Sequence, residues 1–284
     1  MKPVIIFRFL AHEGPGYLGD FLTFNNIEWQ LIKVDEGEPL PASIQGESNL
    51  RSEIESGEFD SGEFERKCLG VLAYSGMVLM GGPMSVNDDL PWIAPLLDLI
   101  GEARDNDIPL LGHCLGGQLM SKAFGAEITK NPIKEIGWGE VTVSKNETAK
   151  NWFGNIKTFN AFHWHGETFS LPQGAIHLLA SPYCQNQAWS IGKHLAFQTH
   201  IEMSAEMVQK WCEEGARELN ESAASPAVQQ ADAMQQELPL HVFFLQKVAK
   251  QVYTQWIQGL AGACYLVLAI INIGQLNASW AIAF

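Results

Sequence analysis

The stretch that decides the fold is residues 108–118, Ile-Pro-Leu-Leu-Gly-His-Cys-Leu-Gly-Gly-Gln, where an apolar run ends in a glycine-rich turn. It predicts a strand, a tight turn that carries Cys114, and a helix over residues 119–124. The positions two before and two after such a turn residue must be nearly free of side chain, as Gly112 and Gly116 are. The sulfur is then exposed at a helix start, where backbone N–H groups stabilise a thiolate and an oxyanion. Taken alone, Cys114 could equally be a buried cysteine that acts as a small hydrophobe.

The segments around this stretch predict an α/β fold, with an open, mostly parallel sheet flanked by helices. Residues 3–10 are a nearly continuous apolar run of the kind that is buried on both faces of a parallel sheet, and residues 29–34 are a second strand. Helices are expected over residues 17–26, 91–105 and 205–219, the last with Ser204 as N-cap. Further strands are expected over residues 126–129, 136–143, 176–180, 187–191 and 194–198.

Residues 198–204, Gln-Thr-His-Ile-Glu-Met-Ser, are expected at the end of a strand, where active sites of α/β proteins collect. A lone histidine there is more often a structural residue than a catalyst. Glu202 changes this reading, because an imidazole base needs an acceptor on its other nitrogen to fix its tautomer and orientation. Cys114, His200 and Glu202 are therefore predicted to form a catalytic triad.

Two more histidines, His163 and His165, are separated by one residue in the segment 159–172. On a strand their side chains point to the same face, which would suit a metal ion. No third ligand follows at a suitable spacing, so we expect no metal site.

The pattern Gly112-x-Cys114-x-Gly116-x-Gln118, followed by His200-x-Glu202, resembles the nucleophile motif and triad of class I glutamine amidotransferases, and more narrowly the glutaminase domain of GMP synthase. The resemblance covers residues 1–215 and implies a flavodoxin-like fold. It implies that the backbone N–H groups of Gly82 and Leu115 bind the oxyanion. It also implies that four residues shape the glutamine pocket: Gln118, His165, Gly166 and Glu167. The sequence departs from the family at Ile201, where proline is common, and in a long insertion before residue 68.

The resemblance implies an enzyme without a cofactor that hydrolyses the amide of glutamine, or a γ-glutamyl amide or peptide, through a thioester on Cys114, releasing glutamate and ammonia. In relatives, ammonia passes to an ATP-dependent synthetase. No phosphate loop or Ser-Gly-Gly motif follows residue 220, so an acceptor enzyme is expected to be a separate chain. Three alternatives stay open: a stand-alone γ-glutamyl peptidase, a cysteine peptidase or isomerase on a similar scaffold, and a binding or regulatory protein whose triad is idle.

Composition limits the partners of the chain. Its 284 residues are 46% hydrophobic and carry a formal charge of -14, which argues against nucleic acid or an anionic membrane as a main partner. The five cysteines are scattered, so neither a disulfide framework nor a zinc site is expected. The N-terminal apolar run is too short for a signal peptide, and a cytoplasmic location is expected.

We expect three parts along the chain. Residues 1–218 form the glutamine amidotransferase-like domain, in which residues 36–67 are an acidic insertion. Residues 219–239 are a linker, and residues 240–284 form a helix and an uncharged hydrophobic tail. The tail, from residue 259, is expected to pack on the domain or on a second subunit; the alternatives are a weak membrane anchor and an end peculiar to this chain. The expected apolar positions of the helix are Val242, Phe243, Leu245, Val248, Val252 and Trp256.

Overall fold

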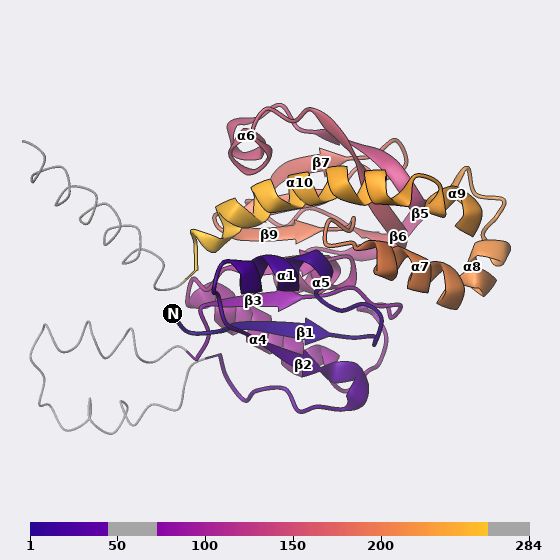
Figure 1. Ribbon diagram of the computed structural model, residues 1–284. Helices are drawn as coiled ribbons and strands as arrows, with labels where there is room; N and C mark the ends of the chain where they lie inside the picture. Colours follow the sequence, from indigo (N-terminus) through magenta and orange to yellow (C-terminus); the bar gives the residue numbers. More distant parts are fainter. Residues whose placement is uncertain (45–72, 261–284) are drawn as a thin grey trace, which may run out of the picture.

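The computed structural model describes residues 1–44 and 73–260, which form a ten-stranded mixed sheet with helices on both faces (Figure 1). One half of the sheet is parallel, with strands in the order β2-β1-β3-β4-β9. This is the strand order of flavodoxin-like folds, so the predicted fold class is confirmed. The parallel strands are β1 (Val4–Arg8), β2 (Trp29–Lys33), β3 (Gly76–Leu79), β4 (Leu110–His113) and β9 (His194–Phe197).

The other half of the sheet is mainly antiparallel and continues from β9 through β8 (Ala188–Ile191) and β7 (Ile176–Ala180) to β5 (Ile128–Val143). The two short strands expected over 126–129 and 136–143 are one long strand, β5. The reason is its partner β6 (Thr158–Phe169), which pairs with β5 on both sides of a register shift between Lys130 and Glu135. The irregularity bends the strand without ending it.

Helices cover the two faces of the sheet as separate layers. Val4 and Ile6 of β1 belong to the core under α1 (Gly16–Phe24) and α10 (Leu238–Ile257). Ile5 and Phe7 belong to the core under α4 (Ile93–Asp105) and α5 (Leu115–Ala123). The alternation follows from the two-residue period of a strand. A further helix, α6 (Glu147–Phe153), lies in the connection between β5 and β6.

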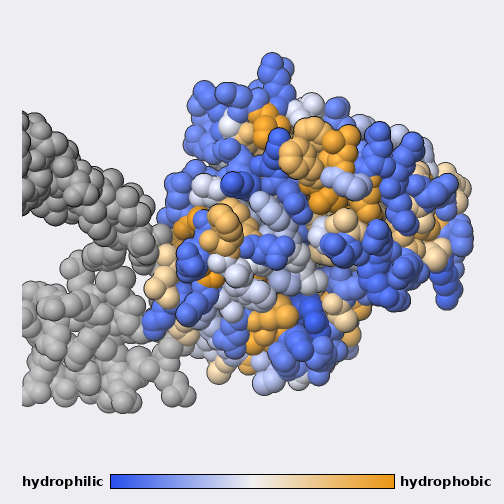
Figure 2. Space-filling view, in the orientation of Figure 1, coloured by the Kyte–Doolittle hydropathy of each residue, from blue (hydrophilic) through white to orange (hydrophobic). Residues whose placement is uncertain are grey.

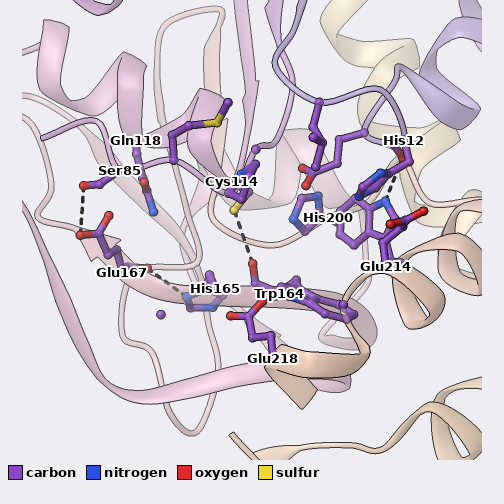
Figure 3. A pocket seen from close by; sticks show the side chains of 18 of the residues that line it. His12, Ser85, Cys114, Gln118, Trp164, His165, Glu167, His200, Glu214 and Glu218 are labelled. Atoms are coloured by element: carbon purple, nitrogen blue, oxygen red, sulfur yellow. Dashed lines mark hydrogen bonds between the residues drawn. The ribbon is translucent and has the colours of Figure 1, made fainter. Parts of the chain in front are cut away.

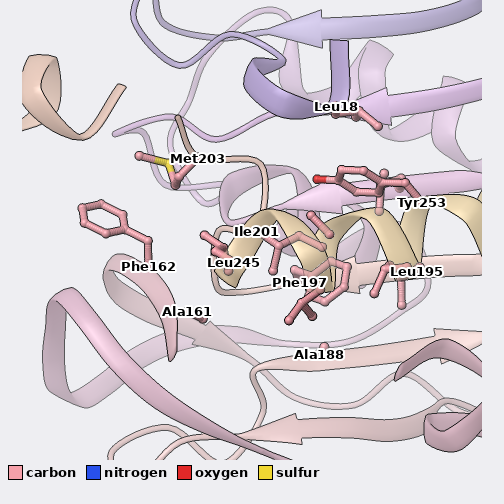
Figure 4. Close-up of a cluster of buried hydrophobic side chains, with 14 of the residues drawn as sticks. Leu18, Ala161, Phe162, Ala188, Leu195, Phe197, Ile201, Met203, Leu245 and Tyr253 are labelled. Atoms are coloured by element: carbon pink, nitrogen blue, oxygen red, sulfur yellow. The ribbon is translucent and has the colours of Figure 1, made fainter. Parts of the chain in front are cut away.

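Helix α10 docks on the sheet with one side and exposes the other. Figure 4 shows Leu245 and Tyr253 projecting from α10 into the buried cluster, near Leu18 of α1. Phe243, expected as a core position, is instead 54% exposed. It follows the buried Val242 by one residue, a rotation of about 100° around a helix. Exposed apolar side chains of α10 also include Leu240 and Phe244, and Figure 2 shows hydrophobic surface over this helix.

The helix expected over residues 205–219 is two helices, α7 (Ala205–Glu214) and α8 (Ala216–Glu221). They meet at Gly215, where a β-carbon would collide with the indole of Trp164. Ser204 caps α7 as expected, because its hydroxyl accepts the N–H of Met207 at 3.2 Å.

Within residues 219–239, the range expected to be a linker, the chain forms the strand β10 (Ala227–Val228) and the helix α9 (Ala231–Gln235). Strand β10 pairs with β5, and Met234 of α9 is buried, so these residues join the sheet and the core. Of the expected insertion, residues 45–67 lie outside the described part, as does the tail from residue 261. The short helix η1 (Val34–Glu36) ends at the first residue of the expected insertion. Among the helices of the described ranges, none has the length and apolar character needed to cross a membrane.

Candidate active site

Cys114 occupies a sharp turn between β4 and α5, at the carboxyl edge of the parallel strands. It is the N-cap of α5 and has φ 50° and ψ -108°, a conformation that few non-glycine residues adopt. The turn is tight because a β-carbon on Gly112 would lie 2.6 Å from the carbonyl group of Gly116. A β-carbon on Gly116 would in turn collide with the carbonyl of Leu79 in β3. The strand, turn and helix predicted from residues 108–124 are therefore present, and the packing explains both glycines.

His200 and Glu202 follow β9, the strand next to β4, and His200 lies beside the sulfur of Cys114 (Figure 3). The backbone N–H of His200 donates to the carbonyl of Phe162 at 2.8 Å, which fixes the loop against β6. The imidazole Nδ1 lies 2.6 Å from Oε1 of Glu202, and both side chains are 1% exposed. Nε2, on the other side of the ring, is buried without a hydrogen-bond partner in the described residues and faces the thiol.

Charges within this buried group stabilise one another. Burial alone would raise the pKa of Glu202, but the nearby His113 and His200 outweigh it and lower the pKa to about 2. Burial would also lower the pKa of His200, yet the carboxylate of Glu202 and the contact with Cys114 raise it well above its ordinary value. The arrangement therefore stabilises the imidazolium that forms when His200 takes up a proton.

The backbone N–H groups of Gly82 and Leu115, two residues that pack against each other, are free donors near Cys114. Neither makes a hydrogen bond within the described residues. Gly82 lines the cavity in front of the sulfur, and Leu115 is the first residue of α5. Two unpaired donors near a nucleophile are what an oxyanion requires.

A cavity of about 450 Å³ opens in front of Cys114. Four residues named from the sequence line it: Gln118, His165, Gly166 and Glu167. The carboxylate of Glu167 accepts a hydrogen bond from the hydroxyl of Ser85 at 3.1 Å (Figure 3). This contact links β6 to the loop that follows β3 and contains Gly82. Gln118 is held by Gln198, whose amide also lies 3.6 Å from the sulfur of Cys114. The structure thus gathers the predicted pocket residues on the side of Cys114 away from His200 (Figure 3).

The mouth of the cavity on the His200 side is formed by aromatic and charged residues that the sequence did not single out. The indoles of Trp164 and Trp211 meet edge to face, with ring centroids 5.9 Å apart. Glu218 of α8 accepts the indole N–H of Trp164 at 2.8 Å and pairs with Lys134 at 2.6 Å. The break at Gly215 lets α8 reach this position.

Glu135, His163 and His165 are buried together, and their ligand atoms lie within 4.8 Å of one another, a group that could hold a metal ion. Glu135 is opposite His165 in the pairing of β5 with β6, so the third ligand missing along the sequence is supplied by the neighbouring strand. Its carboxylate already accepts the hydroxyl of Ser181 at 2.7 Å and the amide of Gln187 at 2.8 Å, and lies 3.1 Å from His165. These contacts fix His165 at the cavity wall.

Four further polar residues of the site were missed by sequence reasoning: Glu13, His113, Gln198 and Tyr253. Glu13 lines the cavity near Gly81 and His200, and burial raises its pKa to about 7. Glu13 could have been found from the sequence, because it follows the first strand and so lies at the carboxyl edge of the sheet, where active sites collect. Gln198 directly precedes the His200 loop. No sequence pattern around His113 or Tyr253 indicates that their polar atoms lie close to each other and to Glu202.

Comparisons with known proteins agree with this geometry. The family model "Glutamine amidotransferase class-I" matches residues 47–211. The crystal structure of a glutamine amidotransferase from Methylobacillus flagellatus is 42% identical, with a TM-score of 0.79 over 92% of this chain and 96% of that one. Gamma-glutamyl peptidase 3 of Arabidopsis thaliana is 28% identical over 48% of this chain and 57% of its own length. The glutamine-hydrolysing GMP synthase subunit of Sulfurisphaera tokodaii is 33% identical over 40% of this chain and 59% of its own length.

The match of the family model covers more than half of the chain, and the chain belongs to the class I glutamine amidotransferase family. The likeness to GMP synthase inferred from the cysteine motif is also confirmed. The chain spans less than two thirds of the length of these two curated relatives.

Proposed function

We propose that this protein hydrolyses the side-chain amide of glutamine, or of a γ-glutamyl compound, through a thioester on Cys114. The observation that carries the proposal is the alignment of Cys114, His200 and Glu202 beside the cavity, with the short contact from His200 to Glu202. A nucleophile, a base and an orienting carboxylate in this order are the requirements of covalent amide hydrolysis.

In the first step the sulfur of Cys114 attacks the amide carbon, and a sulfur–carbon bond forms while the thiol proton passes to His200. The tetrahedral oxygen is bound by the N–H groups of Gly82 and Leu115. His200 then returns the proton to the nitrogen, the carbon–nitrogen bond breaks, and ammonia or an amine leaves. In the second step His200 activates a water molecule, which cleaves the thioester and releases glutamate.

The γ-glutamyl group would occupy the side of the cavity formed by Gln118, Gly166 and Glu167. The carboxylate of Glu167 offers an anion to the α-ammonium group of the substrate, and Ser85 holds that carboxylate in place. The leaving group would lie on the other side, towards His200, because His200 must reach its nitrogen.

Two forms of this function differ in the fate of the ammonia. The relative named as part of GMP synthase supports a separate synthetase partner, and the relative named a gamma-glutamyl peptidase supports a stand-alone hydrolase. A partner-dependent module completes its oxyanion site on binding, and the loss of one oxyanion donor costs about two to three orders of magnitude in rate. The isolated chain would then be slow.

Release of glutamate and ammonia by the purified full chain tests the proposal, with glutamine and several γ-glutamyl peptides as substrates. A turnover near ~10 per second, a median value for enzymes, favours the stand-alone hydrolase. A turnover at least a hundredfold lower, with a thioester on Cys114 detected by intact mass, favours the partner-dependent form. Absence of both turnover and thioester would support the idle binding protein instead.

A further inference from the structure

Behind the triad, a second pair of polar side chains faces the carboxylate of Glu202. Its Oε2 atom, the one not used by His200, lies 3.6 Å from Nε2 of His113. The hydroxyl of Tyr253 lies 3.3 Å from the same nitrogen. His113 and Tyr253 are fully buried, and His113 directly precedes the nucleophile. A chain of polar atoms therefore runs from Cys114 through the triad to α10.

The protonation of His113 can be inferred from its surroundings. Burial lowers the pKa of His113, and the carboxylate of Glu202 opposes that shift. Nδ1 is buried without a hydrogen-bond partner in the described residues, whereas Nε2 lies between an anion and a phenol. A proton on Nε2 faces the carboxylate of Glu202, and on Nδ1 it would face no acceptor. The ring is held by Phe197 of β9, stacked at a centroid distance of 5.8 Å.

We propose that His113 and Tyr253 are positioning residues: the Nε2–H of His113 faces the second oxygen of Glu202, and the hydroxyl oxygen of Tyr253 holds the His113 ring, so that the first oxygen of Glu202 stays aligned with His200. The inference rests on the proposed function. It makes α10 part of the catalytic apparatus, although this helix lies beyond residue 211, where the match to the family model ends.

The need for such support follows from the burial of Glu202. Its Oε2 atom has no partner at hydrogen-bond distance, and water does not reach it. Without the N–H dipole of His113, the carboxylate would lose the polar group that faces Oε2, and its side-chain contact with the imidazole of His200 would have to orient it. The other titratable group facing this pair is Tyr17 of α1, whose ring centroid lies 6.3 Å from that of Tyr253.

Three variants and one matched control separate positioning from packing. Tyr253→Phe removes only the hydroxyl. His113→Phe keeps a ring to stack on Phe197 but removes both nitrogens, and His113→Gln keeps an amide N–H for Glu202. The control is Tyr17→Phe, which removes a hydroxyl from the same cluster but not from the chain of polar atoms.

We expect Tyr253→Phe to lower kcat by about threefold to tenfold with KM unchanged, the size of one neutral hydrogen bond. His113→Phe should lower kcat by about tenfold, because it removes the dipole that faces Oε2 from beyond hydrogen-bond distance, and His113→Gln should recover part of the loss. Tyr17→Phe should match the parent protein. Equal kcat in all variants would overturn the proposal. It would also be overturned if His113→Gln and His113→Phe had equal thermal stability and the kcat of His113→Gln were no higher.

Two readouts do not need turnover and keep this test separate from that of the proposed function. One is the downfield proton resonance of the short contact between His200 and Glu202, assigned by its loss in Glu202→Gln. The other is the rate at which iodoacetamide alkylates Cys114, mapped by mass spectrometry. Both should change in Tyr253→Phe and not in Tyr17→Phe, even if no substrate is turned over. Unchanged values for both in His113→Phe would refute the positioning role.

Discussion

Glu13 should make the stability of this protein fall as the pH rises. Its carboxyl lies in the loop after β1, against Gly81 and near His200, and makes no hydrogen bond or ion pair within the described residues. Burial is the main cause that raises its pKa, the charge of His200 opposes the rise, and Glu202 adds to it. The substitution Glu13→Gln replaces the carboxyl by a neutral group of the same shape.

The magnitude follows from the shift of the pKa from 4.5 to about 7. One unit corresponds to about 1.4 kcal/mol, so the full effect is about 3 kcal/mol. Because the folded protein binds this proton more tightly than the unfolded chain, the contribution is fully present below pH 4.5 and is lost as the pH rises to about 7. Above that pH the folded state holds a half-buried, unpaired carboxylate, so about 3 kcal/mol is the upper end of the effect.

Urea unfolding of both proteins at a series of pH values between 4.5 and 8 measures the effect. As the pH rises across this range, the free energy of unfolding of Glu13→Gln should increase by about 3 kcal/mol relative to that of the parent protein. The exposed Glu28→Gln is the control and should follow the parent. Parallel curves for the parent and Glu13→Gln would show that the carboxyl is solvated, and the account of its burial would be wrong.

Three further substitutions test the turn, the nucleophile and a helix cap. Cys114→Ser should abolish hydrolysis with the fold intact. A glutamine-like diazo-ketone should label Cys114 alone. Equal labelling of all cysteines in peptide mass maps would contradict the assignment. Gly116→Ala should destabilise the protein by about 3 kcal/mol or more, through overpacking against Leu79, whereas Gly101→Ala, in open space on α4, should be neutral or stabilising in thermal melts. Ser204→Ala should lower the free energy of unfolding by about 1 kcal/mol in urea unfolding. An unchanged value would show that the cap does not stabilise α7.

The residues that sequence reasoning found are those whose roles leave a local pattern. Cys114 lies between a strand and a helix with glycines at fixed spacing, and His200 and Glu202 are two residues apart. The conformation of Cys114 and the contact from His200 to Glu202 both follow from features within a few residues of each. Strand β1 was equally predictable, since all five of its residues are buried and four of them are apolar.

The residues that were missed act across long separations in the chain. His113 and Tyr253 are 140 positions apart, and Tyr253 has the spacing of an ordinary apolar position of α10. Glu135 meets His165 only because β5 and β6 pair with a register shift, which no short pattern encodes. Gly215, where α7 and α8 meet, packs against the indole of Trp164, which is remote in sequence. Such contacts are set by tertiary packing and override local preference.

The order of the contributing elements along the chain also sets the order in which the parts of the site leave the ribosome. Cys114 leaves the ribosome before β9, so a nascent chain carries the nucleophile without His200 or Glu202. Helix α10, which closes the core beneath them, is made later still. A chain cut before β9 therefore has Cys114 but lacks His200 and Glu202. In terms of the function proposed above, such a chain holds the nucleophile without its base.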